Sequence, residues 1–284
     1  MQLYALDEYR KVVFANHAKK HRNYTCFECQ TSVRVRGGFH RQNHFFHIDA
    51  ERSCRQNGKS MEHIQVQCLV QRTLPKDACV LEKRFPEINR IADAFWESEK
   101  LVFEIQCSPI SAAEVKQRNQ DYGKLGLSVV WIFHERQFKR WRLSAAEECL
   151  KHSAYYYTNV NSEGEGIIYD ALHVIHRGKK IFISDPFPIA VAHPKRRGVK
   201  QTTNWPEAMR NRWDRKVYFG EDVFDSALCT DTLEELFRKV KILEGQFLEL
   251  PKTGFVIFIR SFWRNFIVRP YRLVFQMLLE SASA

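Results

Sequence analysis

The sequence predicts an α/β protein, with a domain of modest size that follows a small metal-binding module and precedes a mixed α/β C-terminal region. Two observations support this prediction. Residues 59–134 combine helical apolar spacing with short apolar runs, in the order helix, strand, strand, strand, helix, strand. Residues 1–58 are turn-rich and contain three cysteines and five of the eleven histidines. The 284 residues leave room for two or three small domains, and we place boundaries after residues 58 and 134.

The first 58 residues have the pattern of short strands joined by turns. Apolar residues run together at Val12–Phe14 and alternate with arginines over residues 33–36. Gly37 and Gly38 predict a turn before the histidine-rich segment. A segment this small is expected to lack a hydrophobic core of its own, so a bound metal would have to stabilise it.

The predicted α/β domain begins with a helix over residues 60–74, where apolar residues recur at helical spacing. The apolar run at residues 79–81 predicts a strand that ends before Pro86. These two elements begin the helix and strand order on which the fold prediction rests.

A strand pair and a second helix complete this domain. Residues 88–96 and 101–106 are expected to pair across a tight turn at 97–100. A capping-box sequence at 111–114 starts a helix that ends near residue 124, and residues 127–133 have the continuous apolar character of a buried strand.

Residues 135–284 give weaker signals. Residues 142–152 favour a helix, 167–183 contain strand-like runs, and 231–247 have the spacing of an amphipathic helix. No apolar stretch approaches the roughly 20 residues that span a membrane. Charged residues are scattered through residues 1–14 in place of an apolar signal core. We therefore expect a soluble, cytoplasmic protein.

Cysteines and histidines in the first module have the spacing of a zinc site. Cys26 and Cys29 form a Cys-x-x-Cys knuckle, and His44 and His47 repeat its two-residue gap. Zn²⁺ takes four nitrogen or sulfur ligands in a tetrahedron at about 2.0–2.3 Å. We predict a structural Zn²⁺ bound by Cys26, Cys29, His47 and either His44 or Cys54. The alternative is a redox Cys-x-x-Cys, but the thioredoxin-type strand and helix that it requires are missing from the sequence.

Two acidic residues on the predicted strand pair are the first candidates for catalysis. A symmetric turn centred between Ser98 and Glu99 pairs residues whose numbers sum to 197, as those of Asp93 and Glu104 do. They would then lie opposite each other on one face, with Cβ atoms about 4.5–5.5 Å apart. Gln106 would share this face, about 7 Å along the strand. Apolar neighbours make two adjacent carboxylates unfavourable unless a hard divalent cation, Mg²⁺ or Mn²⁺, neutralises them.

Other interpretations of these residues stay open at this stage. The face could be an exposed one with solvated acids, or Asp93 could simply pair with Arg90. Glu62 on the preceding helix could add a third carboxylate, although a single glutamate on a helix is more often exposed. Cys107 and Ser108 lack a suitably placed histidine to activate either as a nucleophile.

Several of these segments resemble one family, in the same serial order. Residues 104–111, Glu-Ile-Gln-Cys-Ser-Pro-Ile-Ser, are similar nearly word for word to a signature of the bacterial competence protein CoiA family. Arg90-Ile-Ala-Asp93, Glu62-His63, the stretch 122–133 and the Cys/His element also resemble that family. The resemblance covers roughly residues 1–134. It implies a PD-(D/E)XK restriction-endonuclease-like core preceded by a zinc-binding element.

The resemblance implies roles for individual residues. Its catalytic candidates are Glu62, Asp93, Glu104 and Gln106. Asp93 and Glu104 become the acids that bind Mg²⁺ or Mn²⁺. Gln106 stands where the superfamily has lysine, and it can orient a water or bond a phosphate oxygen but brings no positive charge. Arg118 and Tyr122, four residues apart on the next helix, are expected to support the site, the alternative being a plain surface stripe.

The chain carries 44 Lys+Arg against 33 Asp+Glu, a net charge of +11 that favours a polyanionic partner, nucleic acid before a membrane surface. Residues 193–216 hold eight basic and two acidic residues, with tryptophans interleaved. Basic side chains bind phosphates, and tryptophan can stack on unpaired bases. The predicted contacts to DNA are Lys195, Arg196, Arg197, Lys200, Arg210, Arg212 and Trp213. The alternative is a solvated surface that its tryptophans anchor to the protein.

Two functions are consistent with these observations. The first is a metal-dependent deoxyribonuclease that hydrolyses phosphodiester bonds, which the resemblance places in transformation with incoming DNA. The second keeps the fold but only holds single-stranded or branched DNA for recombination proteins, and Gln106 keeps this alternative open. Residues 252–272, basic and aromatic, are expected to pack as a C-terminal helix or hairpin rather than to lie on a membrane.

Overall fold

The computed structural model describes residues 1–248 except for 39–40, 50–53, 55, 57–58, 152, 197–204, 214–216 and 224–231. The predicted C-terminal segment 252–272 lies outside the described residues. The chain divides into two compact units, Met1–Val240 and Lys241–Ala284, and the account below concerns the first. No helix among the described residues is long and apolar enough to cross a membrane.

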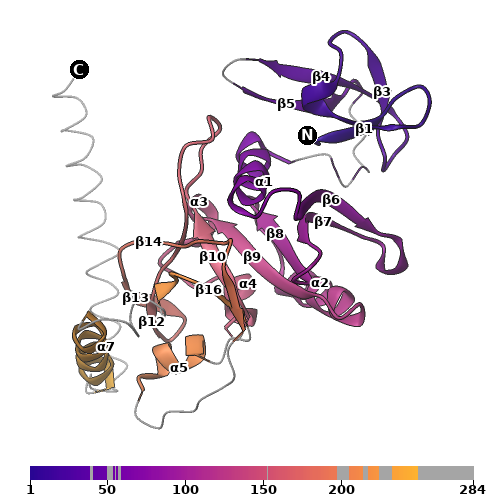
Figure 1. Ribbon diagram of the computed structural model, residues 1–284. Coiled ribbons are helices and arrows are strands. Elements are labelled where there is room, and N and C mark those ends of the chain that lie inside the picture. Colours follow the sequence, from indigo (N-terminus) through magenta and orange to yellow (C-terminus); the bar gives the residue numbers. More distant parts are fainter. Residues whose placement is uncertain are drawn as a thin grey trace, which may run out of the picture. The chain divides into compact units, whose positions relative to one another are not determined.

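The N-terminal module is an antiparallel five-stranded sheet in the order β2-β1-β3-β4-β5, drawn in indigo in Figure 1. Its strands are β1 (Tyr4–Leu6), β2 (Val12–Phe14), β3 (Asn23–Thr25), β4 (Ser32–Gly38) and β5 (Arg41–His47). The histidine-rich segment is thus itself a strand, which its composition did not predict.

This module has a small hydrophobic core, so the expectation that it lacks one is wrong. Val33 and Val35 alternate with exposed arginines along β4, and they pack against Tyr24 and Phe45. The rings of Tyr24 and Phe45 lie 5.1 Å apart at 61°. Cys26 and Cys54 belong to the same buried cluster. A metal bound there would add to an existing core.

The central domain is a mixed seven-stranded sheet in the order β14-β11-β10-β9-β8-β7-β6. Its strands are β6 (Cys79–Phe85), β7 (Arg90–Trp96), β8 (Leu101–Gln106), β9 (Ser128–His134), β10 (Tyr155–Thr158), β11 (Ile168–Asp170) and β14 (Phe187–Pro188). Strands β8, β9 and β10 are parallel, and the flanking pairs are antiparallel. The sheet therefore continues well past residue 134, where we placed a domain boundary.

Helices α1 (Met61–Thr73) and α2 (Ala112–Lys124) pack on opposite faces of this sheet. Val130 and Ile132 share a core with α1, whereas Trp131 and Phe133 share one with Val115 of α2. Such alternation is what a strand buried on both faces requires. Both helices start as predicted: the hydroxyls of Ser60 and Ser111 accept the backbone N–H groups of His63 and Glu114.

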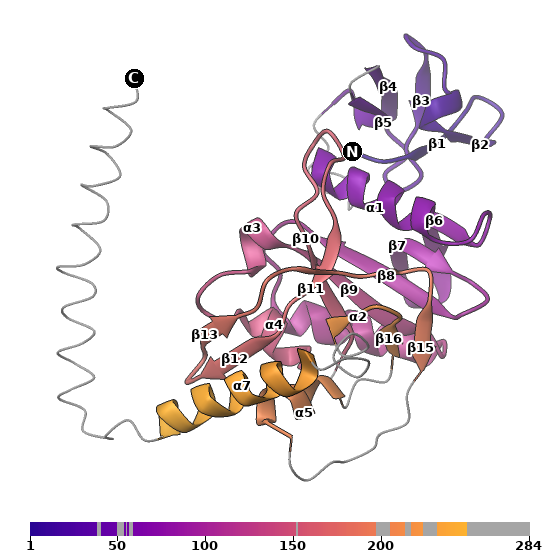
Figure 2. The ribbon, with the colours of Figure 1, turned by 60° about the vertical axis from the view of Figure 1, so that its left-hand side comes forward.

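The remaining elements lie outside the two large sheets (Figure 2). They are η1 (Ala15–His17), η2 (Pro86–Ile88), α3 (Glu135–Phe138), α4 (Ala145–Cys149), β12 (His173–His176), β13 (Lys179–Ile183), β15 (Pro194–Arg196), α5 (Glu207–Trp213), β16 (Val217–Phe219) and α7 (Thr232–Leu248). Of these, η1 belongs to the N-terminal module, η2 connects β6 to β7, and α3 lies beside β9 and β10. The helix predicted over 142–152 is shorter than expected, because Ser144 caps it and it ends at Cys149. The helix predicted over 231–247 agrees with α7.

Candidate active site and metal centre

Four side chains of the N-terminal module converge as a metal centre would require. The ligand atoms of Cys26, Cys29, His47 and Cys54 all lie within 4.8 Å of one another. The Cys26 and Cys54 sulfurs are 3.8 Å apart, and Cys29 Sγ is 3.2 Å from His47 Nε2. Two thiolates on one tetrahedral Zn²⁺ at about 2.3 Å would be about 3.8 Å apart. The donor set and its spacing therefore fit a metal such as zinc.

Of the two candidates for the fourth ligand, Cys54 and not His44 belongs to this cluster. His44 is not part of the cluster, and its Nδ1 lies 2.9 Å from the carbonyl oxygen of Gln42. Burial raises the pKa of Cys54 to about 12 and raises the pKa of Cys26 as well. A bound cation would supply the charge that stabilises these thiolates.

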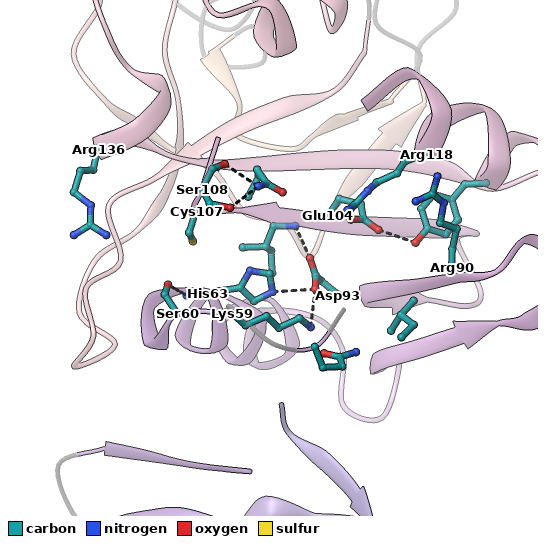
Figure 3. Close-up of a pocket in the computed structure, with 15 residues that line it drawn as sticks. Lys59, Ser60, His63, Arg90, Asp93, Glu104, Cys107, Ser108, Arg118 and Arg136 are labelled. Atoms are coloured by element: carbon teal, nitrogen blue, oxygen red, sulfur yellow. Dashed lines mark hydrogen bonds and ion pairs between the residues drawn. The ribbon is translucent and has the colours of Figure 1, made fainter. Parts of the chain in front are cut away.

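A second candidate site is a cavity of about 370 Å³ in the central domain, at the ends of β7 and β8. The N-terminus of α1 and one face of α2 border it (Figure 3). Its charged lining residues are the carboxylates Asp93 and Glu104 and the cations Lys59, Arg90, Arg118 and Arg136. Two acids among four cations suit a ligand that combines a divalent cation with an anionic phosphate.

Asp93 is buried and surrounded by hydrogen-bond donors. Its Oδ1 lies 2.9 Å from His63 Nε2 and 3.0 Å from Lys59 Nζ, and its Oδ2 accepts the backbone N–H of Ile105 at 2.9 Å. Gln67 donates to its carbonyl oxygen at 2.9 Å. Burial alone would raise the pKa of Asp93, but His63, Lys59 and the Ile105 N–H outweigh it and lower that pKa. Asp93 is therefore a carboxylate.

Glu104 is also buried, but its partners and its pKa differ from those of Asp93. Tyr122 donates its hydroxyl to Oε1 at 2.7 Å, and Arg118 Nη1 lies 2.6 Å from Oε2. Burial and the charge of Asp93 raise the pKa of Glu104 to about 7, although Arg118 and Tyr122 oppose that rise. Near neutral pH, Glu104 exists in both protonation states and gains charge readily if a cation binds.

A chain of ion pairs across β7 and α2 fixes the Arg118 guanidinium. Arg118 Nε donates to Glu114 at 2.8 Å, and Glu114 also accepts from Arg90 Nη1 at 2.9 Å. Arg90 Nε in turn donates to Asp121 at 3.0 Å. The predicted supporting residues Arg118 and Tyr122 thus contact Glu104 directly and hold its carboxylate in one orientation.

The geometry of the two acids differs from the expected cross-strand pair. The β7–β8 register has the predicted sum, with Phe95 facing Val102, but the ladder ends at Ala94 and Phe103. Beyond that point Asp93 takes the Ile105 N–H, so the strands separate there. Asp93 then contacts α1 and Glu104 contacts α2, and the two line one cavity without lying side by side on one face.

Of the other two predicted catalytic residues, Gln106 lies in the cavity and Glu62 does not. Gln106 lines the cavity, and its amide nitrogen donates to the carbonyl and hydroxyl oxygens of Ser108 at 2.7 and 3.0 Å. Glu62 is not a lining residue, and its carboxylate lies 3.6 Å from Arg136 Nη2. Its neighbour His63 is the α1 residue that reaches Asp93, as Figure 3 shows.

Sequence reasoning missed Lys59 and His63. The Glu62-His63 pair was noted, but the glutamate was chosen because acids bind metals more often than an isolated histidine does. Lys59 lies just before the N-cap of α1, where nothing in the local pattern indicates a role. Only the packing of this helix end against β7 brings its ammonium to Asp93.

The basic segment is described only in part. Arg197 and Lys200 lie outside the described residues, and the side chains of Lys195, Arg196 and Trp213 are not described. Arg210 is exposed on α5. Arg212 is buried and forms an ion pair with Asp170, so its guanidinium is not available to a phosphate in this conformation.

Comparison with known proteins was informative for the central domain. Residues 60–189 match the family model of the nuclease-like domain of competence protein CoiA. No curated protein and no solved structure gives a significant match. The matched stretch runs from the start of α1 to the end of the seven-stranded sheet and contains Asp93, Glu104 and Gln106. It confirms the resemblance noted in the sequence.

Proposed function

Because the chain carries the nuclease-like domain of the CoiA family, we propose that it is a Mg²⁺- or Mn²⁺-dependent deoxyribonuclease that processes DNA in competence or recombination. The observation that carries this proposal is the cavity in which Asp93 and Glu104 lie among four cationic side chains. The N-terminal cluster would hold a structural Zn²⁺, since four protein ligands leave no open position for a substrate.

Asp93 and Glu104 are the residues that would hold the divalent cation. Asp93 Oδ1 already has three donors within 3.4 Å, whereas Asp93 Oδ2 and the two Glu104 oxygens each accept one donor and retain a second lone pair for a cation. A divalent cation held there supplies Lewis acidity at the scissile phosphate and lowers the pKa of a bound water.

The cationic residues would bind and orient the phosphate backbone. Arg118 lines the cavity and is held by Glu104 and Glu114, so it would need little reorganisation to bind a phosphate there. Arg136 is 68% exposed and forms only a long pair with Glu62, so it can turn toward a strand that enters from solvent.

Gln106 would position water rather than supply charge. Its amide nitrogen is taken by Ser108, and its amide oxygen has no hydrogen bond among the described residues. That oxygen can accept a hydrogen bond from a water molecule and so orient the water's lone pair toward phosphorus.

The competing function is a DNA-binding protein that uses the nuclease fold without cleaving. The observation that favours it is that protein groups already contact both acids: the Lys59 ammonium and the His63 ring contact Asp93, and the Arg118 guanidinium contacts Glu104. A divalent cation must compete with these fixed charges, whereas a binding protein needs no such cation.

The test is metal-dependent cleavage of single-stranded, duplex and branched DNA by Glu104→Ala. This variant should lose Mg²⁺- or Mn²⁺-dependent cleavage but retain metal-free DNA binding, because it removes a negative charge that faces phosphate. Glu97→Ala, in the exposed β7–β8 turn, removes the same charge away from the cavity and should behave like the parent.

Gln106→Lys distinguishes the two functions. A parent that cleaves should keep activity or gain some when a cation is added beside the phosphate. If only Gln106→Lys cleaves, the natural protein is a DNA binder on a nuclease fold. If both are inert on every substrate and metal, the enzyme proposal is wrong.

A further inference from the structure

A third carboxylate, that of Glu82 on the edge strand β6, lies next to Asp93. The β6–β7 register pairs Leu81 with Ala94 and Lys83 with Ala92, so Glu82 stands opposite Asp93. Glu104, on β8 beyond the last paired residues Ala94 and Phe103, lines the same cavity as Asp93. Glu82 was not among the candidate residues, because nothing in the sequence of β6 sets it apart from its neighbours.

Glu82 also has an unusual backbone conformation. Its φ is +52°, in the left-handed region that side chains other than glycine rarely adopt, although it lies in the middle of a strand. Strain of this kind persists only where the surroundings impose it, and it is concentrated at functional sites. The Glu82 carboxylate is 6% exposed, so this conformation keeps an acid inside the protein next to Asp93.

Lys59 is the cation that joins these two acids. Its Nζ lies 3.2 Å from Glu82 Oε1 and 3.0 Å from Asp93 Oδ1, and its side chain is only 12% exposed. The same ammonium lines the cavity shared by Asp93, Glu104 and Gln106 (Figure 3). An ammonium held by two buried carboxylates is a fixed point charge that needs no rearrangement when a ligand binds.

We propose that Lys59 is the phosphate-facing cation of this active site, with Glu82 as the residue that positions it. The catalytic role of Lys59 rests on the proposed nuclease function, whereas its binding of phosphate does not. Asp93 and Glu104 would hold a divalent cation, and the Lys59 ammonium would supply a second positive charge to a phosphate bound in the same cavity. Lys59, just before α1, would thereby supply the positive charge that Gln106 lacks.

The N-terminal module takes part in this arrangement. The backbone N–H of Leu3, just before β1, donates to the second oxygen of Glu82 at 3.2 Å. Each Glu82 oxygen thus has one partner, Lys59 on one side and the N-terminal module on the other. The module therefore helps to orient the carboxylate that holds the active-site cation.

The experiment compares Lys59→Met with Lys76→Met. Lys76 is exposed between α1 and β6 and does not line the cavity, so its variant removes the same charge elsewhere. Two quantities are measured on the full chain with Mn²⁺: the cleavage rate at saturating DNA, and the Kd of thymidine 5′-monophosphate by calorimetry. We expect Lys59→Met to lower kcat by about 10²–10³, the loss typical of one removed charge-stabilising donor.

The monophosphate Kd should rise about tenfold in Lys59→Met, because one charged contact is lost. DNA affinity, which many phosphate contacts share, should change less. Lys59→Arg keeps the charge and should restore most of the monophosphate affinity. Lys76→Met should match the parent in every measurement.

Further outcomes separate the Lys59 assignment from the nuclease proposal. Lys59→Met leaves Glu82 without its cation and could misfold, so the double variant Lys59→Met with Glu82→Gln removes one acid together with the lysine. If the double variant binds the monophosphate as the parent does, Lys59 only neutralises Glu82 and the assignment is overturned. Equal results for Lys59→Met and Lys76→Met also overturn it. If no variant cleaves DNA but Lys59→Met alone weakens monophosphate binding, the nuclease proposal fails and the Lys59 assignment stands.

Discussion

Replacing Glu104 with glutamine is expected to stabilise the protein at alkaline pH and to have a much smaller effect at acidic pH. The glutamate is 1% exposed and faces Asp93, so its ionised form is disfavoured in the folded protein. Glutamine has nearly the same shape as the neutral acid, and its amide can still bond the Tyr122 hydroxyl. The substitution therefore removes the ionised form and keeps the packing.

The magnitude follows from the pKa of Glu104, which rises from 4.5 to about 7 in the folded protein. Each pKa unit corresponds to about 1.4 kcal/mol, so ionisation of Glu104 costs the folded state about 3 kcal/mol. Below its unfolded pKa, both states hold the proton and nothing is lost. Between pH 4.5 and 7 only the folded state holds it, so the free energy of unfolding falls as the pH rises.

The assay is urea unfolding of the parent and Glu104→Gln at several pH values, without added divalent metal. The stability advantage of the variant should grow by about 3 kcal/mol from pH 4.5 to pH 8. Asp93, whose pKa is lowered, loses its contribution only as the pH falls through the acidic range, and it does so in both proteins. Glu114→Gln is the control: Arg118 and Arg90 outweigh burial and lower the pKa of Glu114, so its variant should gain nothing as the pH rises. Parallel stability curves for the parent and Glu104→Gln would refute the reasoning.

Three further predictions concern other parts of the chain. Metal analysis of protein purified without chelator should find one Zn²⁺ per chain, lost in Cys54→Ser but retained in His44→Gln; zinc loss in His44→Gln alone would contradict the ligand set. Lys180 is fully buried and paired with Glu147, so Lys180→Met should lower the free energy of unfolding by about 3–5 kcal/mol because it leaves a buried acid without its cation. Denaturant unfolding measures this change, and a loss below about 1 kcal/mol would contradict the prediction. DNA affinity should fall steeply as the salt concentration rises. A triple alanine substitution should reduce the slope of log K against log salt concentration by about two to three units if each residue contacts a phosphate. An unchanged slope would favour the solvated-surface interpretation. The residues of that triple substitution are Arg196, Arg197 and Lys200.

The parts of the site that sequence could predict are those set by local rules. Helix starts at Ser60 and Ser111 depend on hydroxyl caps, and the β7–β8 register depends on a short turn, so both followed from residue spacing. The resemblance and the i, i+4 spacing suggested that Arg118 and Tyr122 support the site, but their contacts with Glu104 are known only from the structure.

The parts that sequence could not predict depend on how separate elements pack. Lys59 and Glu82 meet only because the start of α1 lies against β6 and β7, and no local pattern encodes that contact. The strands β7 and β8 separate where the Asp93 carboxylate accepts the backbone N–H of Ile105, and a regular strand register does not predict such a bond. The choice of Cys54 over His44 likewise required three-dimensional distances.

The number of residues in the turn between β7 and β8 determines which side chains of β8 reach the cavity. It is closed by the Lys100 N–H bonding to the Glu97 carbonyl at 3.0 Å, and it sets the register that follows. One residue more or fewer would move every side chain of β8 to the other face, so Phe103 would turn toward α2 and Glu104 would enter the core under α1. Such an indel would remove Glu104 from the cavity although every residue proposed for catalysis remained in the sequence. A search for intact relatives should therefore require the ten residues that separate Asp93 from Glu104 as strictly as the two acids themselves.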